Sequence, residues 1–272
     1  MTETKSQIAS RTAKGGIDAE HKIVNKFNNW LNDADAQRWL KTMNYNLAQI
    51  ETIEAMIIGG ISEKADVQVH VIVRISRKKK DEKGNIESIE NIQVKKVSNA
   101  TGSNQIERKH VDKYIEPWHM PLSVARTLQY FTGDLKPYIS NPVEEDRMFM
   151  DEMTPEQRDE LKKFLTDNMV MIISDIVRGR GRFAVEWMLV LQEYTDKNGN
   201  YQYNDILLSI NETINFYVGD HTVEFPPARK DGTHAGIRMG RITIQRKGGD
   251  DPCSLQFKSD PSKLLDLKPL FS

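Results

Sequence analysis

The sequence predicts an α/β (α+β) fold, because segments with helical periodicity and segments with strand alternation follow one another along its 272 residues. Apolar residues recur at helical spacing over residues 23–31, and valines alternate with other residues over 67–73. The last third is richer in strand patterns, notably over 237–246 and 254–257. Since neither repeats nor a long linker interrupt the chain, we expect one domain spanning residues 1–272.

The first predicted element is an amphipathic helix. Its apolar residues, among them Ile23 and Phe27, follow the acidic residues Asp18 and Glu20. An apolar stripe of this kind most simply faces the core. A second helical stretch is expected through residues 47–50.

The next two elements form a predicted β-hairpin. Its first strand starts at Val67, and its second strand holds the alternation around Ile92 and Val94. Residues 77–89 carry a charge run and the turn pair Gly84-Asn85, which predicts a long solvated tip. Three lysines in this tip either keep it soluble or contact phosphate: Lys78, Lys79 and Lys80.

Helices and strands continue in the rest of the chain. Thr154, Pro155 and Gln157 form a capping-box start for a helix that ends near Asp167. The arginines among glycines at 178–182 favour a helix-terminating loop, with phosphate contact as the alternative. The remaining predicted segments are helices over 105–115, 123–131 and 169–177 and a buried strand over 183–194.

Charge is unevenly distributed, although the formal net charge is only −1. Residues 74–113 hold eleven Lys and Arg against six Asp and Glu, a net of +5, and residues 225–258 hold seven against three, a net of +4. Residues 144–167 hold nine acids against four bases, a net of −5. Because phosphate attracts cations, the first two segments are candidates to face nucleic acid, and the acidic segment is expected to face water.

Composition excludes several classes of protein. No run approaches the roughly 20 apolar residues that span a bilayer, and residues 1–16 lack the apolar stretch of a signal peptide, so we expect a cytoplasmic protein. The single cysteine, Cys253, excludes an internal disulfide and a cysteine-built zinc site. The six histidines show no metal-ligand spacing.

The residues that can carry chemistry lie on the predicted hairpin. Gln93 and Lys95 point to the same face because they are two residues apart on a strand, and strand pairing can bring Asp66 beside them. The Asp66 carboxylate, the Gln93 amide oxygen and the backbone carbonyl of Val94 would suit Mg²⁺. Lys95 would orient a water nucleophile or stabilise the charge that develops on a phosphate. The same spacing also occurs by chance on solvated sheet faces.

Longer stretches of the sequence resemble one enzyme family. Residues 91–99, together with Gly102, Asn104, Gln105 and Ile106, resemble the active-site strand and following loop of the HinP-type restriction endonucleases, which cut the palindrome GCGC. Further similar segments recur in the same order at 27–30, 147–150, 178–187, 241–250 and 255–258. Together they cover most of the chain.

This resemblance implies a type II restriction endonuclease of the PD-D/E-x-K nuclease superfamily, with a mixed central sheet flanked by helices. It implies a Mg²⁺-dependent phosphodiester hydrolase that acts on double-stranded DNA, here at a short G+C palindrome such as GCGC, and leaves 5′-phosphate ends. It also implies a bacterial host with a cognate DNA methyltransferase, and either a homodimer or a monomer acting twice. Within the single domain, the catalytic core is expected at about 47–131 and the DNA-reading part at about 183–260.

The resemblance gives roles to the hairpin residues. It implies that Asp66 is the metal-binding acid, Gln93 the second metal-site residue and Lys95 the catalytic lysine. The superfamily usually has Asp or Glu where Gln93 stands, although the HinP-type family is similar in carrying Gln. The approach to Asp66 is ambiguous by about two residues, so Glu63 is the reserve candidate for the acid. We prefer Asp66 because the alternating strand follows it directly.

Residues that contact DNA are expected in two regions. Arginine suits guanine and glutamine offers both a donor and an acceptor, so Gln245, Arg246 and Lys247 form the best base-reading group. A second group follows the catalytic strand, at a predicted helix start where Asn104 is either a helix cap or a groove contact. The second group comprises Ser98, Asn99, Asn104, Gln105 and Arg108.

Two rival functions stay open at this stage. One is a structure-specific or repair nuclease of the same superfamily, and the other is a DNA-binding protein that has lost cleavage. The intact pair of Asp66 and Lys95 argues against the second.

Overall fold

A computed structural model describes residues 5–58, 64–76, 83–97, 104–195, 199–227, 236–246 and 253–268. The chain divides into two compact units, each assembled from separate segments. The first unit comprises residues 1–102, 178–213 and 261–272, and the second comprises 103–177 and 214–260. Both units therefore take residues from each of the two predicted ranges, 47–131 and 183–260.

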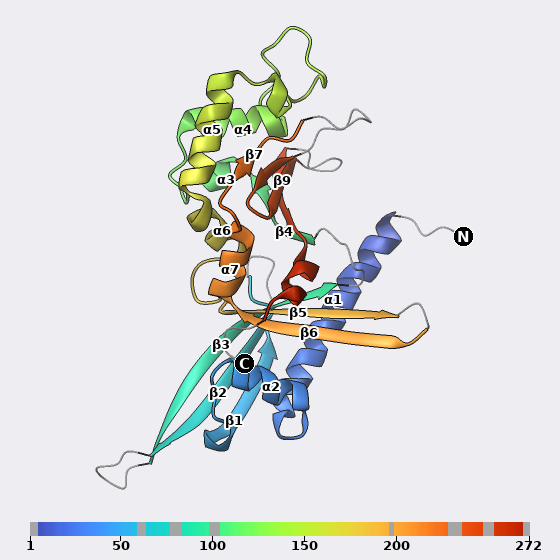
Figure 1. The fold of residues 1–272 in the computed structure, drawn as a ribbon, viewed down its shortest axis with the longest axis vertical. Coiled ribbons are helices and arrows are strands. Elements are labelled where there is room, and N and C mark those ends of the chain that lie inside the picture. Colours follow the sequence, from blue (N-terminus) through green and yellow to red (C-terminus); the bar gives the residue numbers. More distant parts are fainter. Residues whose placement is uncertain are drawn as a thin grey trace. The chain divides into compact units, whose positions relative to one another are not determined.

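The described helices and strands follow one another in groups along the chain (Figure 1). The helices are α1 (Lys5–Asn28), α2 (Ala34–Thr42), α3 (Asp112–Ile115), α4 (Leu122–Thr132), α5 (Pro155–Asp167), α6 (Met169–Arg178) and α7 (Ile210–Val218). The strands are β1 (Ile50–Ile57), β2 (Val67–Ser76), β3 (Lys83–Val97), β4 (Asn104–His110), β5 (Trp187–Thr195), β6 (Tyr201–Ser209), β7 (Val223–Glu224), β8 (Ile237–Met239), β9 (Ile242–Arg246) and β10 (Ser254–Ser259). Short 3-10 turns lie at Trp30–Asn32, Leu47–Gln49, Met150–Glu152 and Pro261–Asp266. No described helix combines the length and apolarity that crossing a bilayer requires.

The first unit contains a five-stranded mixed sheet in the order β1-β2-β3-β5-β6. Strand β3 pairs in parallel with β5, and the other pairs are antiparallel. In the hairpin of β2 and β3, Val67 lies opposite Ile92 and the pairing runs on to Ser76 opposite Lys83. The predicted mixed sheet flanked by helices is thereby confirmed.

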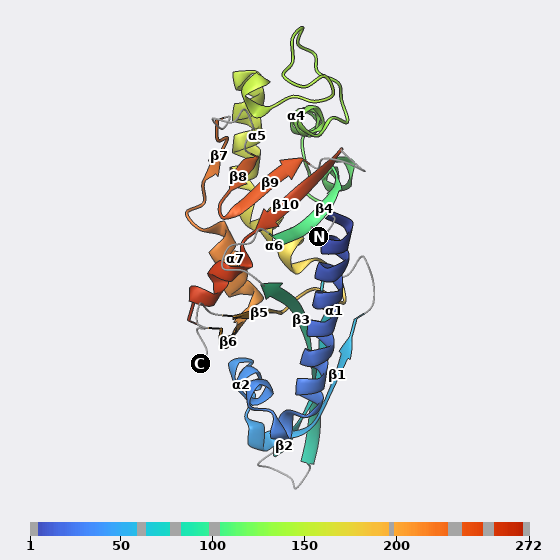
Figure 2. The same ribbon diagram turned by 90° about the vertical axis from the view of Figure 1, so that its right-hand side faces the viewer.

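Helix α1 covers one face of this sheet, and Figure 2 shows it running alongside β1, β2 and β3. Its residues Ile23 and Phe27 are fully buried with Trp39 of α2. Val67, Val69 and Val71 of β2 and Ile92 and Val94 of β3 belong to the same core. Since successive strand residues alternate between faces, this packing leaves the odd-numbered polar residues of β3 on the opposite face.

The second unit contains a five-stranded sheet in the order β4-β10-β9-β8-β7, as Figure 2 shows. Phe257 of β10 packs edge-on against Tyr114 and Trp118, whose rings stack on each other with centroids 4.2 Å apart. The indole nitrogen of Trp118 donates to Asp175 of α6 at 2.7 Å. Aromatic packing and this hydrogen bond hold one face of the sheet against the helices of the unit.

Several predicted elements are confirmed. Helix α5 starts as its capping box predicts, because the Thr154 hydroxyl accepts from the Gln157 N–H at 3.3 Å and the Gln157 side chain accepts from the Thr154 N–H at 3.0 Å. The helix ends at Asp167, as predicted. The alternation at Val67 and the strand patterns in the last third also form strands. Helix α6 ends at Arg178, where Gly179 adopts a left-handed φ of 74°.

Other predicted elements are wrong. Residues 104–110 form strand β4 instead of a helix, because they pair with β10 from Asn104 opposite Ser259 to His110 opposite Ser254. The second helix ends at Thr42, and residue 50 begins a strand. The pair Gly84-Asn85 lies within β3, opposite Ile75 and Arg74, so the hairpin tip is shorter than predicted. Lys78, Lys79 and Lys80 lie outside the described residues.

Candidate active site

Asp66 lies at the entrance to strand β2, one residue before Val67. Its backbone N–H donates to the Ile92 carbonyl at 2.9 Å, which ties it to β3. Its carboxylate oxygen Oδ2 accepts from the N–H of Val94 at 2.7 Å. The acid is therefore fixed to the stretch of β3 that carries the other two predicted catalytic residues, Gln93 and Lys95.

Gln93 lies on the face of β3 that points away from the apolar core. Its side chain is only 4% exposed, and its Oε1 has no hydrogen-bond partner among the described residues. A buried acceptor without a donor is costly, so such an atom is expected to meet a cation or a donor that binds later. Lys95, two residues further on, shares this face and is partly exposed.

A buried hydrogen-bond network supports Gln93 from behind. Asn91, the neighbour of Gln93 on the same face, donates through Nδ2 to the carbonyls of Arg182 and Ala184, at 3.0 Å each. Its Oδ1 accepts from the Gln68 side chain on β2 at 2.9 Å. These bonds hold β2, β3 and residues 182–184 in one arrangement, and sequence patterns alone gave no sign of them.

The electrostatics of the site couple three charged groups. Burial raises the pKa of Asp66 above its usual value, while the Lys95 charge and the Val94 N–H act in the opposite direction. Burial also raises the pKa of Glu20 on α1, and the negative charge of Asp66 raises it further, whereas Lys95 lowers it. Glu20 is half-buried and within electrostatic reach of the predicted pair. The sequence pattern indicated only that Glu20 precedes the apolar stripe of this helix.

The residues present fit a divalent cation of the hard, oxygen-seeking kind. Asp66 uses Oδ2 to accept from Val94, and its Oδ1 accepts no hydrogen bond from any described residue. The buried Oε1 of Gln93 supplies a second oxygen. Within the described ranges, no cluster of three or more His, Cys, Asp or Glu forms a cation site. A cation here would therefore depend on one carboxylate and one amide, supplemented by water and phosphate oxygens.

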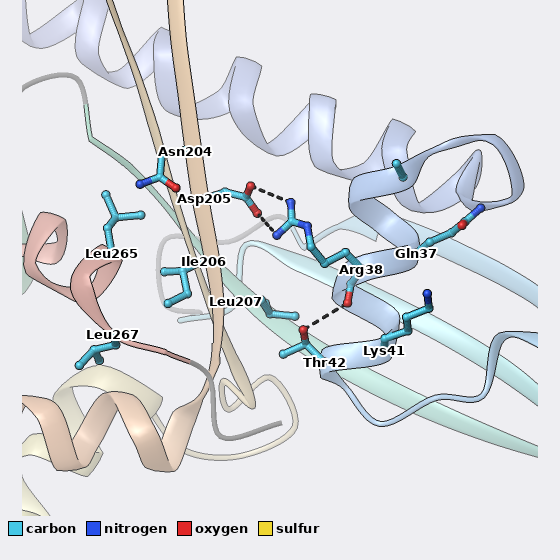
Figure 3. A pocket seen from close by; sticks show the side chains of 11 residues that line it. Gln37, Arg38, Lys41, Thr42, Asn204, Asp205, Ile206, Leu207, Leu265 and Leu267 are labelled. Carbon is cyan, nitrogen blue, oxygen red and sulfur yellow. Dashed lines mark hydrogen bonds and ion pairs between the residues drawn. The ribbon is translucent and has the colours of Figure 1, made fainter. Parts of the chain in front are cut away.

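A pocket of about 750 Å³ also lies in the first unit, lined by α2, β6 and the residues around Leu265 (Figure 3). Its charged groups satisfy each other, because Arg38 donates to the two carboxylate oxygens of Asp205 at 3.1 and 2.8 Å. The indole nitrogen of Trp39 donates to the same carboxylate at 2.6 Å. None of the predicted catalytic residues lines this pocket, and its polar wall is best explained by the packing of α2 on β6.

The predicted DNA-contacting residues are placed on two strands of the second unit. Asn104, Gln105 and Arg108 lie on β4, and Gln105 and Arg108 are exposed. Gln245 and Arg246 lie on β9. Four further predicted site residues lie outside the described residues: Glu63, Ser98, Asn99 and Lys247.

Arg246 points into the second unit. Its guanidinium lies 3.7 Å from the centroid of the Phe149 ring, donates to Glu144 at 2.9 Å and donates to the Met148 carbonyl at 3.3 Å. Its side chain is 12% exposed, and burial lowers its pKa to about 10. Gln245 and Arg246 are consecutive on β9 and therefore project to opposite faces of the sheet.

The fold is that of a restriction endonuclease. It is similar to the crystal structure of restriction endonuclease MspI in complex with its cognate DNA, with a TM-score of 0.62 and 13% sequence identity over 94% of each chain. At this identity the likeness concerns the fold. A sequence profile of the R.HinP1I restriction endonuclease family matches residues 43–265, and the chain belongs to this family. It is therefore a type II site-specific deoxyribonuclease, as the resemblance implied. No curated protein sequence matches the chain.

Proposed function

We propose that the enzyme hydrolyses phosphodiester bonds of double-stranded DNA with Mg²⁺, at the short palindrome GCGC, and leaves 5′-phosphate ends. The observation that supports this most directly is the strand-end arrangement in which Asp66 is bonded to the backbone of Val94, between Gln93 and Lys95. Membership of the R.HinP1I family supports the choice of GCGC. The MspI structure contains that enzyme's cognate DNA, which agrees with a duplex substrate.

In this proposal Asp66 and Gln93 hold the cation, with the Val94 carbonyl as a third oxygen. The N–H and C=O of one strand residue point to the same side, so the Val94 carbonyl faces the side on which its N–H meets Asp66. When bound, the cation supplies charge neutralisation at the scissile phosphate and makes water more acidic. Glu63 stays the reserve candidate for the acid.

In this proposal Lys95 acts on the attacking water and on the phosphate. Lys95 shares the strand face of Gln93, and its charge opposes the rise that burial gives to the pKa of Asp66. There it orients the attacking water and stabilises the negative charge that grows on the phosphate during attack. The hydrogen bond between Asp66 and Val94 keeps the acid and the lysine in register while this happens.

Cleavage of plasmid DNA by the purified protein tests this function. We expect discrete fragments in Mg²⁺ and intact plasmid in excess chelator, and sequencing of the fragment ends should give GCGC and a 5′-phosphate. Dispersed or branch-dependent cutting would instead favour a structure-specific nuclease, and binding without cutting would favour a DNA-binding protein. Equal cutting in chelator and in Mg²⁺ would refute the cation's role.

Paired substitutions identify the acid. We expect Asp66→Ala to abolish cutting while leaving specific DNA binding intact, and Glu63→Ala to leave cutting largely unchanged. The reverse result would move the cation site to Glu63.

We further propose that the enzyme acts in the cytoplasm beside a methyltransferase of the same specificity, because unprotected host DNA would otherwise be cut. A homodimer or a monomer acting twice would both serve a palindrome. Analytical ultracentrifugation with and without a GCGC duplex separates these two arrangements.

A further inference from the structure

The second unit presents one polar face on three neighbouring strands. Apolar and polar residues alternate along β9 and β10, with Ile242, Ile244, Leu255 and Phe257 buried on one face. The residues between them point the other way, because successive strand residues alternate. This second face, called the amide face below, is made of Thr243, Gln245, Gln256, Lys258, Gln105 and Arg108.

Strand register arranges the amide face in two rows. In one row Gln245 of β9 lies opposite Gln256 of β10, which lies opposite Arg108 of β4. In the other row Lys258 of β10 lies between Thr243 and Gln105. Neighbouring strands are about 4.8 Å apart, and residues two apart on a strand are about 7 Å apart. The distance between the two rows is therefore close to the length of two base-pair steps, which are about 3.4 Å each.

Two side chains of the amide face are bonded to each other. The Nε2 of Gln256 donates to the Oε1 of Gln105 across the strand pair, which orients both amides. One N–H of Gln256 is used in this bond, while its Oε1 and second N–H take part in no other hydrogen bond with the described residues. An amide with a free acceptor and a free donor can accept from cytosine N4 or donate to guanine O6 or N7.

The face also has the charge that a nucleic-acid ligand requires. Lys258 and the exposed Arg108 contribute two cations, and none of the six residues of the face is acidic. On the next strands, Arg238 of β8 lies opposite Thr243 and forms an ion pair with Glu224 of β7. Strands β9 and β10 are neighbours inside the five-stranded sheet, between β4 and β8. Two adjacent strands have about the width of a ribbon that a major groove about 12 Å wide admits. Strand β4 is the third strand and lies at the sheet edge, so Arg108 would fall on the phosphates that border the groove.

We propose that Gln256 and Gln245 read base edges in the major groove as a ribbon formed by β9 and β10, while Arg108 contacts the flanking phosphate. This inference rests on the proposed function and adds Gln256 and Lys258 to the residues that meet DNA. It also assigns Arg246 to the interior, where it is bonded to Glu144 and packed on Phe149, in place of base reading.

Cleavage of single-substitution duplexes tests the ribbon. The rate kcat/KM is measured on the cognate duplex and on duplexes that each carry one altered base pair, for the unaltered enzyme and for Gln256→Ala. We expect the variant to lose about 5- to 150-fold of its discrimination at one base pair and to keep it at the others. Gln256 is partly exposed and outside the catalytic strands, so the thermal unfolding midpoint should be unchanged.

Two control variants distinguish residues that read bases from a residue that contacts phosphate and from a residue that packs in the interior. Arg246→Lys keeps a charge beside Glu144, and we expect every base preference to survive in it while the protein becomes less heat-stable. For Arg108→Ala we expect unchanged preferences and a salt dependence of binding that is shallower by about one unit of slope. Loss of one base preference in Arg246→Lys with none in Gln256→Ala would overturn the assignment.

The outcomes distinguish this inference from the function on which it rests. If the unaltered enzyme cuts no duplex, the proposed function and the ribbon are both contradicted. If the unaltered enzyme cuts at a specific site and Gln256→Ala discriminates as well as it does at every position, only the ribbon is contradicted.

Discussion

The two sheets of this enzyme treat their polar side chains in opposite ways. On the first sheet, Gln68, Asn91 and Gln93 are 4%, 6% and 4% exposed, and Asn91 is bonded to loop carbonyls. On the second sheet, Gln105 and Arg108 are exposed and Gln256 is partly exposed. Both patterns come from period-two alternation, and on the first sheet residues 182–184 are bonded over the polar face.

The difference agrees with the two tasks proposed above for the sheets. Groups that stabilise developing charge work best when they are fixed and shielded from water before the reaction begins. Groups that recognise a base edge have to exchange water for the partner and therefore need access. Substitutions on the first sheet should therefore change cation binding, rate or stability, and substitutions on the amide face should change sequence preference.

The largest effect is expected from Lys95→Ala, with Lys96→Ala as its control. Lys95 lies beside Asp66, whereas Lys96 points to the other side of the strand and pairs with Glu193 at 2.7 Å. We expect Lys95→Ala to lower kcat by at least about 10³-fold with specific DNA binding retained, and Lys96→Ala to cut nearly normally. Single-turnover cleavage and a binding assay in Ca²⁺ measure the two quantities. Similar losses of kcat in both variants would mean that cleavage depends on the positive charge of the strand and not on the position of Lys95.

The next effect concerns the cation requirement at Gln93. Gln93→Leu removes the buried oxygen and should weaken cation affinity by at least about 10-fold. Gln93→Glu replaces the amide by a carboxylate, which binds Mg²⁺ more strongly, so half-maximal cleavage should need less Mg²⁺. Cleavage rates over a Mg²⁺ titration give both values. An unchanged Mg²⁺ requirement in both variants would remove Gln93 from the site.

A smaller effect, on stability, is expected from Asn91→Ala. This substitution leaves the carbonyls of Arg182 and Ala184 and the Gln68 side chain without their partner. Each buried group that loses its hydrogen bond costs roughly 1–3 kcal/mol, so the free energy of unfolding should fall by about that amount or more. Urea unfolding measures it, and Arg108→Ala on the amide face serves as the control with little change. Equal stability of the two variants would contradict the view that polar side chains are structurally required on the first sheet and not on the second.

The smallest effect is expected at Asp66 in the absence of divalent cations. Burial raises the pKa of this acid, so the folded state favours its protonated form. The stabilisation that protonated Asp66 gives to the folded state is fully present below the usual aspartate pKa of 3.8. It is lost as the pH rises through the higher pKa that Asp66 has in the folded protein. In chelator at neutral pH, Asp66→Asn should therefore unfold at a slightly higher temperature, and the difference should shrink on acidification. A variant that melts lower at neutral pH would refute this.

Sequence patterns predicted that Asp66, Gln93 and Lys95 come together, because the signals for this arrangement are local. Alternation fixes that Gln93 and Lys95 share a face, and the register of Val67 with Ile92 then brings Asp66 to them. The same reasoning applied to Arg246 would have placed it with Ile242 and Ile244 on the buried face. We expected it to face DNA because arginine is common at such contacts, and residue type outweighed position in that prediction.

Other features could not be predicted because they depend on distant parts of the chain. Residues 104–110 hold many good helix formers, yet pairing with β10 makes them a strand, and tertiary pairing overrides local propensity. The support of Asn91 by the carbonyls of Arg182 and Ala184 joins positions about ninety residues apart, separated by 91 and 93 in sequence. No local pattern records such a contact.

The buried position of Arg246 changes how the enzyme's charge should be counted. Residues 225–258 carry a formal net charge of +4, and Arg246 is one of their seven cations. Arg246 is largely buried and is paired with the partly exposed Glu144, so we expect it to displace no counterion when a duplex binds. The ionic-strength dependence of binding should accordingly report fewer phosphate contacts than a tally of arginines and lysines implies.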